Sequence, residues 1–213
     1  MIHHESRLSG ADTVLIMLPG ALMTPQQMRE AGLFDVVQGA SCALDLIAPN
    51  LHAGNDNLDA LHSLEVDWLA PARRHYKRVW LGGISRGGHL ALSYVASQCG
   101  HVDGLCLLAP YAGGRATLNE IERAGGLGTW EYDPDLPGDA DVRLWNWLKT
   151  PLPTLPIFMG YGEQDRFADG MRSLEKRMPE ATFLRIPGGH DWSVWLNLWK
   201  SFMTHGHLKG GAG

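Results

Sequence analysis

A serine flanked by glycines follows a short apolar run and precedes a predicted helix, in the segment Gly83-Ile84-Ser85-Arg86-Gly87. A serine at a tight strand-to-helix turn is held in a strained backbone conformation, and small residues two positions away let the turn close. Such a turn projects the hydroxyl beyond the carboxyl end of a sheet and points the first helix amides at a nearby anion. The placement predicts a catalytic serine at Ser85, although G-x-S-x-G also occurs by chance in a chain with 26 glycines.

Two later loops contain the other groups that a nucleophilic serine needs. A serine hydroxyl is a weak nucleophile, so it requires a base, and the base requires an acid that orients it. One predicted strand runs into Gly162-Glu163-Gln164-Asp165, and the next runs into Pro187-Gly188-Gly189-His190-Asp191-Trp192. Both loops leave the carboxyl ends of predicted parallel strands, where ligands bind in open α/β sheets. Three such loops in the order serine, acid, histidine are far less probable by chance than any one of them.

These motifs resemble the α/β-hydrolase fold family, and the resemblance covers nearly the whole chain. It implies that Ser85 is the nucleophile, that His190 is the general base and that Asp165 holds the imidazole. The expected fold is α/β, with a mostly parallel sheet of about six strands flanked by helices. Because only about a dozen residues precede the first clear strand, we expect the family's opening hairpin to be shortened or missing.

The resemblance also implies an oxyanion hole. Leu18-Pro19-Gly20-Ala21 corresponds to the family's oxyanion loop. One amide is then expected from Arg86, the residue after the nucleophile, and the other from Ala21 or Leu22. The Arg86 side chain is open to two interpretations, since it could bind an anionic substrate group or lie on the surface beside a carboxylate.

Other titratable residues compete for the same roles. His89 lies one helical turn after Ser85 and should point along the helix, so a packed or capping histidine is the favoured interpretation. Glu163 and Asp169 are rivals for the acid, but Asp165 follows a glycine turn just past the strand end, where the resemblance places the acid. Asp191 cannot easily reach the ring of the adjacent His190 and is expected to cap the last helix.

The chain is rich in tryptophan, with 8 of 213 residues. Trp192 begins a helically spaced stripe after His190, which favours a core first and a pocket wall second. Trp130 and Trp145 belong to a stretch rich in glycine and proline. Trp130, Trp145 and Trp192 are the candidate substrate-binding residues, although the first two could equally form the small core of a cap.

The apolar pattern alternates between strands and helices, which is typical of a parallel sheet covered on both faces. We expect one domain over residues 1–213, with a small cap insertion at about 111–153. Expected strands cover 13–18, 43–48, 78–81, 104–108, 156–159 and 182–186, and expected helices include about 25–38, 58–69, 86–98 and 193–203.

Composition excludes several classes of protein. Hydrophobic residues make up 45% of the chain and its net charge is −5, so a basic surface for nucleic acid is not expected. No apolar run approaches the roughly 20 residues of a membrane helix, and no signal peptide is visible. Cys42, Cys99 and Cys106 lie in apolar stretches and are interpreted as small buried residues in a reducing compartment. The expected location is the cytoplasm.

The predicted activity is hydrolysis of a carboxylic ester or thioester of a small-molecule acyl substrate through an acyl-enzyme. No cofactor is expected, and no metal, since no histidine spacing fits a metal motif such as H-E-x-x-H. The alternatives are a peptidase, lactone hydrolase, acyltransferase or lyase on the same scaffold, or a hydrolase-like protein that binds a ligand without turnover. The oligomeric state stays open.

Overall fold

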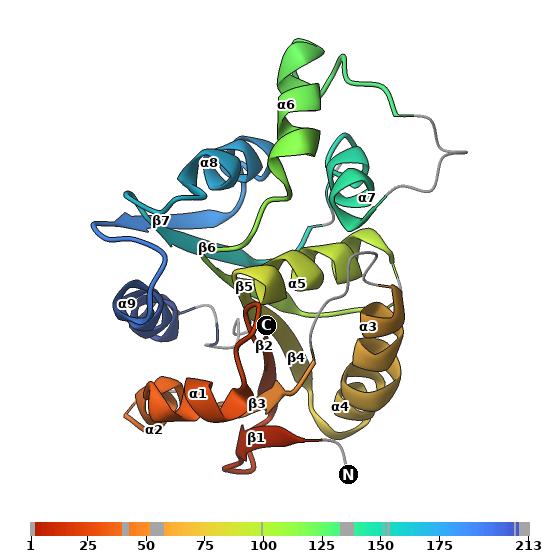
Figure 1. The fold of residues 1–213 in the computed structure, drawn as a ribbon. Helices are drawn as coiled ribbons and strands as arrows, with labels where there is room; N and C mark the ends of the chain where they lie inside the picture. Colours follow the sequence, from red (N-terminus) through yellow and green to blue (C-terminus); the bar gives the residue numbers. More distant parts are fainter. Residues whose placement is uncertain are drawn as a thin grey trace.

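The computed structural model describes residues 3–39, 43–51, 58–98, 100–132, 139–150, 152, 154–206 and 208. Within these ranges one sheet of seven strands has the order β1-β3-β2-β4-β5-β6-β7 (Figure 1). Strands β2 to β7 are parallel, and β1 is antiparallel to β3. The strands are β1 His4–Arg7, β2 Thr13–Leu18, β3 Asp45–Pro49, β4 Arg78–Ile84, β5 Gly104–Leu108, β6 Ile157–Gly162 and β7 Thr182–Ile186.

The sheet has one strand more than the expected six, because the N-terminal segment adds β1 at the edge. Buried Asp45, the first residue of β3, holds the connection that follows β1. Its carboxylate accepts hydrogen bonds from the Ser9 amide at 2.6 Å and from the Tyr76 hydroxyl at 3.0 Å. Burial raises the pKa of Asp45, but hydrogen bonds from Ser9, Ala11 and Tyr76 outweigh it, so the net pKa is lowered.

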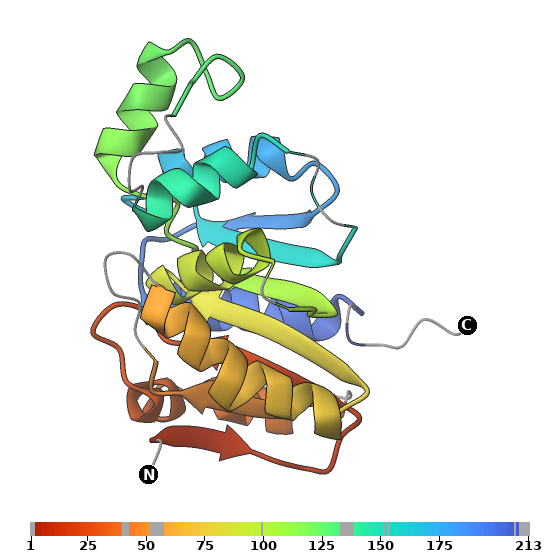
Figure 2. The same ribbon diagram turned by 90° about the vertical axis from the view of Figure 1, so that its right-hand side faces the viewer.

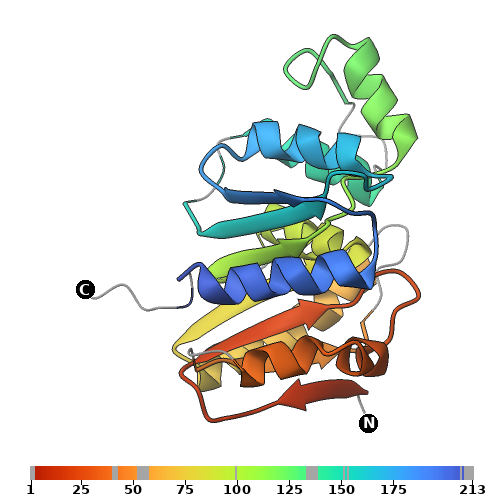
Figure 3. The same cartoon turned by 90° about the vertical axis from the view of Figure 1, so that its left-hand side faces the viewer.

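Helices cover both faces of the sheet, with α1, α2 and α9 on one face and α3, α4 and α5 on the other (Figures 1 and 3). A π-helical segment, Leu64–Leu69, joins α3 to α4. The helices are α1 Pro25–Glu30, α2 Leu33–Gln38, α3 Leu58–Ser63, α4 Ala70–His75, α5 Arg86–Ala96, α6 Arg115–Arg123, α7 Ala140–Trp147, α8 Ala168–Arg177 and α9 Trp192–Thr204.

The prediction of one helix over 25–38 is wrong in one respect, because two helices, α1 and α2, cover this range. Its start is as predicted: the Thr24 hydroxyl accepts from the Gln27 amide at 3.2 Å, and the Gln27 side chain accepts from the Thr24 amide at 2.8 Å. Gly32 then adopts a φ of 92°, a left-handed conformation that ends α1 and turns the chain into α2.

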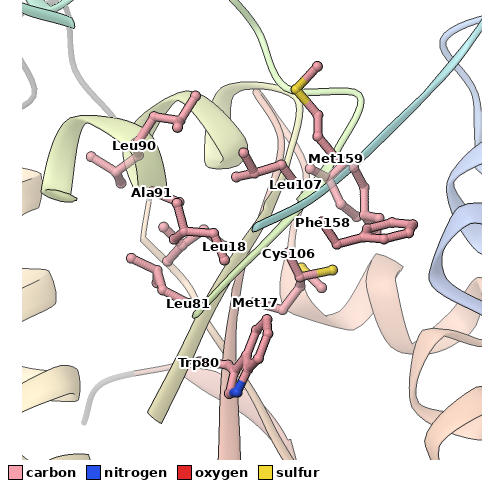
Figure 4. Packing of buried hydrophobic residues seen from close by; sticks show 14 of the residues in the cluster. Met17, Leu18, Trp80, Leu81, Leu90, Ala91, Cys106, Leu107, Phe158 and Met159 are labelled. Carbon is pink, nitrogen blue, oxygen red and sulfur yellow. The ribbon is translucent and has the colours of Figure 1, made fainter. Parts of the chain in front are cut away.

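The core lies on both faces of the central strands (Figure 4). Trp80 of β4 and Phe158 of β6 face α9, where their rings lie 5.5 and 5.4 Å from that of Phe202. Leu81 and Leu107 point to the other face, toward α5. This alternation is what two-sided burial of a parallel sheet requires. Cys106 is buried, as expected, and is a free thiol. Burial raises the pKa of this thiol. Cys42 and Cys99 lie outside the described residues.

The chain between β5 and β6 carries α6 and α7 (Figures 1 and 2). Helix α7 packs against α5, and α6 projects beyond it at the β7 end of the molecule. The expected cap at about 111–153 includes 133–138, 151 and 153, which lie outside the described residues. In the part of the chain that is described, no helix is long and apolar enough to cross a membrane.

Candidate active site

Ser85 occupies the turn between β4 and α5 in a conformation rare for a side-chain-bearing residue, with φ 52° and ψ −113°. Its amide donates to the Leu108 carbonyl at 3.0 Å, and its carbonyl accepts from the amides of His89 and Tyr111 at 3.1 and 2.9 Å. These bonds to β5, α5 and the chain after β5 hold the backbone in a geometry that would otherwise relax. Such a conformation is usually kept where it positions a functional side chain.

The glycines around Ser85 are required by close backbone approach. A Cβ at Gly83 would collide with the backbone of Gly87, and one at Gly87 would collide with the carbonyls of Leu18 and Pro19. The helix that begins after Ser85 therefore packs directly on the end of β2. This contact brings the loop after β2 beside the serine.

A second close approach joins the loops after β6 and β7. A Cβ at Gly162 would meet the carbonyls of Gly188 and Gly189. The Gln164 amide donates to the Gly188 carbonyl at 3.0 Å, and the Gln164 side chain accepts from the Gly188 amide at 2.5 Å. Since Asp165 follows Gln164 and His190 follows Gly189, these bonds set the distance between the two side chains.

A continuous chain of hydrogen bonds links Asp165, His190 and Ser85. Nδ1 of His190 lies 2.6 Å from Oδ2 of Asp165, and its Nε2 lies 2.9 Å from Oγ of Ser85. The Asp165 side chain is fully buried, and its Oδ1 accepts from the Phe167 amide at 2.8 Å. The structure thus brings together the three residues that the sequence singles out. With Nδ1–H donating to Asp165, Nε2 is free to accept a proton from the serine.

Aromatic rings hold the imidazole of His190 edge-on. The rings of Phe167 and Trp195 each lie 5.1 Å from it, at 82° and 86°. Sequence reasoning did not single out Phe167, and the available signal was only an aromatic residue two positions after the candidate acid. The two rings restrict rotation of the imidazole away from Ser85.

The rival acids lie elsewhere. Glu163 is exposed, and the Asp169 side chain is 96% exposed and paired with Arg172. Asp191 caps α9 as predicted, accepting from the amides of Ser193 and Val194 at 2.9 and 3.2 Å. Among these carboxylates, only Asp165 contacts the ring of His190.

His89 is a packed histidine, as predicted. It is fully buried, with Nδ1 3.1 Å from the Tyr111 carbonyl and Nε2 3.4 Å from the carboxylate of Asp141, without a hydrogen bond. Burial lowers its pKa to about 4, although Asp141 acts in the opposite direction. The neutral ring joins α5, the helix after Ser85, to α7.

The loop after β2 forms a tight turn beside Ser85. The Met23 amide donates to the Gly20 carbonyl at 3.2 Å, and Leu22 has a φ of 59° while its side chain is 96% exposed. Among the described residues, the amides of Ala21 and Leu22 have no acceptor. A Cβ at Gly20 would stand 3.6 Å from Cβ of Ser85. The two amides without partners among the described residues therefore belong to the turn that begins at Gly20, beside the candidate nucleophile.

Two cavities lie near the site, and two of the three candidate tryptophans line them, one in each. A cavity of about 620 Å³ is lined by Ala21, Leu22 and His190, together with Trp192. A larger one, about 800 Å³, is lined by Trp145 and by residues of α6 and α8, but by none of the three hydrogen-bonded residues. Trp130 lines neither and is buried instead.

The Arg86 side chain packs against an aromatic ring. Its guanidinium lies 5.0 Å from the centre of the Tyr111 ring, a cation–π contact. Arg86 is half-buried and faces the chain that leads into α6. This places a positive charge close to Ser85.

A parallel sheet with an antiparallel first strand, a strained serine after β4 and an acid and a histidine after β6 and β7 defines the α/β-hydrolase fold. Solved structures of that fold match the chain over most of its length. S-formylglutathione hydrolase FrmB from Staphylococcus aureus matches with a TM-score of 0.69 and 13% identity, over 92% of this chain and 84% of the other. Est1E from Butyrivibrio proteoclasticus gives 0.69 and 15%, over 98% and 94%.

A third similar structure is the monoacylglycerol lipase of Paleococcus ferrophilus, with a TM-score of 0.67 and 12% identity over 95% of this chain and 97% of the other. No protein-family model matches the sequence, and no curated protein matches it. The likeness to known proteins therefore lies in the fold, and the roles of individual residues rest on the geometry of the site.

Proposed function

We propose that the protein is a serine hydrolase that cleaves a carboxylic ester or thioester through an acyl-enzyme. The observation that carries the proposal is the unbroken hydrogen-bond chain from Asp165 through His190 to Ser85. The names of the structural neighbours, which include a hydrolase, esterases and a lipase, point to the same class of reaction. The buried free thiol of Cys106 is compatible with a cytoplasmic location, which we retain as part of the proposal.

The reaction begins when Oγ of Ser85 attacks the substrate carbonyl and its proton passes to Nε2 of His190. The negative charge on the carbonyl oxygen is stabilised by the Arg86 amide and by the amide of Ala21 or Leu22. Collapse of the tetrahedral intermediate breaks the bond to the alcohol or thiol, which takes the proton from His190. Water then attacks the acyl-enzyme with His190 again as base, and the acid is released.

We place one half of the ester in the 620 Å³ cavity beside the loop after β2. It contains His190 and the indole of Trp192, and it borders the two free amides. We retain Trp192 as a substrate-binding residue on this basis. Trp130 is better explained as cap core, since it is buried under the Lys149 side chain, whose ammonium lies 4.9 Å from its ring.

Hydrolysis of p-nitrophenyl esters of increasing acyl length tests the proposal. The wild type should hydrolyse short or medium esters, and Ser85→Ala should lose about 10³-fold or more in kcat while keeping its fold. The preferred chain length would measure the pocket. Equal rates for folded wild type and Ser85→Ala would reject Ser85 as nucleophile and favour a ligand-binding protein.

A further inference from the structure

The larger cavity, about 800 Å³, carries a charge opposite to that of the whole protein. It lies between α6 and α8, with Trp145 of α7 contributing to its wall. Five basic side chains against two acidic ones give its lining a formal excess of three positive charges, in a chain of net charge −5. The basic residues are Arg115, Arg166, Arg172, Lys176 and Arg177, and the acidic ones are Glu122 and Asp169.

Part of this charge is available to a ligand. Arg172 is paired with Asp169, and Arg177 donates twice to the Leu148 carbonyl, at 3.0 and 2.6 Å. Arg115 and Lys176 are exposed, and no carboxylate among the described residues lies within ion-pair distance of either. The two side chains come from α6 and α8, on opposite sides of the same cavity.

Two residues that line the cavity also contact residues of the candidate active site. Phe167 lines it, and the ring of Phe167 lies 5.1 Å from that of His190. Tyr111 lines it as well, 5.6 Å from Phe167, while its amide binds the Ser85 carbonyl. A group extending from an ester carbonyl at Ser85 past Phe167 would therefore enter this cavity.

Most of the remaining lining is apolar. Leu118, Ile121 and Leu127 lie on the α6 side, and Gly170 of α8 allows close packing, since a Cβ there would stand 2.9 Å from that of Ala112. An alkyl or aryl linker would bury its surface against these residues, while its charged end would face the cations.

We propose that this cavity binds an acidic group, a carboxylate or a phosphate, on one half of the ester that Ser85 cleaves. The inference rests on the proposed function and narrows its substrate class to acidic esters with an apolar spacer. Exposed cations each contribute a small attraction, so the preference comes from several acting together and weakens with salt. Arg86, beside Tyr111, extends the positive field toward the serine.

Matched ester pairs test the substrate preference. One pair is mono-p-nitrophenyl adipate and its methyl ester, with the charge on the acyl half; the other is 4-acetoxybenzoate and its methyl ester, with the charge on the leaving half. The wild type should favour the acidic member of at least one pair about tenfold in kcat/KM. Arg115→Gln combined with Lys176→Gln should lower that ratio about tenfold, through KM, and Lys200→Gln on α9 should leave it unchanged.

A salt series adds an independent readout of the same preference. Raising the salt from about 0.1 M to about 1 M, where the Debye length falls from about 10 to about 3 Å, should reduce the ratio. A wild type without preference for either acidic ester, or a ratio equally lowered by Lys200→Gln, would overturn the inference.

Binding without turnover separates this inference from the proposed function. Calorimetry on Ser85→Ala with benzoate, phenyl phosphate and neutral benzyl alcohol should show binding of at least one anion. The double variant in that background should weaken the binding about tenfold, and the tighter anion identifies the acidic group. Anion binding would support the cavity assignment even if no ester were hydrolysed. Absence of binding by both anions would refute the assignment and leave the hydrolase proposal intact.

Discussion

The carboxylate of Asp165 lies 2.6 Å from Nδ1 of His190 and has no exposed surface, while the imidazole itself is only 11% exposed. The Phe167 amide occupies the other carboxylate oxygen at 2.8 Å. Both oxygens thus have fixed partners, and the carboxylate cannot rotate without losing one of them. This contact, together with the rings of Phe167 and Trp195, orients the imidazole and so sets the reach of Nε2 to Ser85.

Replacing the carboxylate by an amide should therefore disable the base and spare the fold. Asp165→Asn should lower kcat on a p-nitrophenyl ester by about 10⁴-fold, because an amide nitrogen facing Nδ1 favours the wrong tautomer. Glu163→Gln is the matched control, since Glu163 is exposed in the same loop and lines neither cavity, and it should retain wild-type kcat. An unaffected Asp165→Asn would refute the assignment of Asp165.

The turn after β2 offers a test of the oxyanion hole that alters one amide alone. Leu22 has positive φ at the third position of the turn closed by Gly20 and Met23, so Ala21 occupies the second position, where proline is favoured. Ala21→Pro should keep the turn, delete one N–H and reduce kcat about 10²–10³-fold. Ala21→Ser, which keeps the amide, should remain active. Full activity of the proline variant would transfer the role to Leu22.

Close packing around the turn between β4 and α5 predicts that one added methyl group has a large effect. Gly87→Ala would drive Cβ into the Leu18 and Pro19 carbonyls, so the free energy of unfolding should fall by about 3 kcal/mol or activity should be lost through displacement of Ser85. Gly128→Ala is the control, since nothing lies within 4 Å of its Cβ position. Urea denaturation and ester hydrolysis are measured on both variants, and a Gly87→Ala protein equal to Gly128→Ala in both stability and activity would contradict the proposed packing.

The buried His89 predicts a stability loss in mild acid. Its folded-state pKa is about 4, below the ordinary 6.5, so between these values the unfolded chain binds a proton that the folded one does not. Stability should therefore be unaffected above about pH 6.5 and fall by about 3 kcal/mol as the pH drops to 4. His89→Asn, which can still donate to the Tyr111 carbonyl, should show a shallower decline than the wild type. Parallel pH profiles would contradict this prediction.

Much of the fold was predictable because its central strands, unlike the partly exposed β7, are buried on both faces. The expected strands at 104–108 and 182–186 agree with β5 and β7, and the central apolar run at 13–18 agrees with β2. By contrast, His4–Arg7 has no apolar pattern, since β1 lies at the edge and is defined by its backbone bonds to β3. Such pairing depends on a partner about 40 residues away, which local pattern does not reveal.

The candidate site, like the fold, was only partly predictable from the sequence. Ser85, Asp165 and His190 were recognisable from glycine turns after strands, because the parallel sheet gathers those turns at one edge. The charged cavity was not, since Arg115 of α6 and Lys176 of α8 come to line one cavity only in the folded chain. Trp130 was assigned to the pocket by its residue type, and its burial became evident only from the folded chain.

The most direct test of the central claim is labelling with a fluorophosphonate probe, followed by mass spectrometry of the labelled peptide. Such a probe reacts with a serine only when a neighbouring base activates it. We predict one label per chain on Ser85, abolished in Ser85→Ala and slowed in Asp165→Asn. Folded wild-type protein that takes up no label, or a label on another serine, would contradict the account.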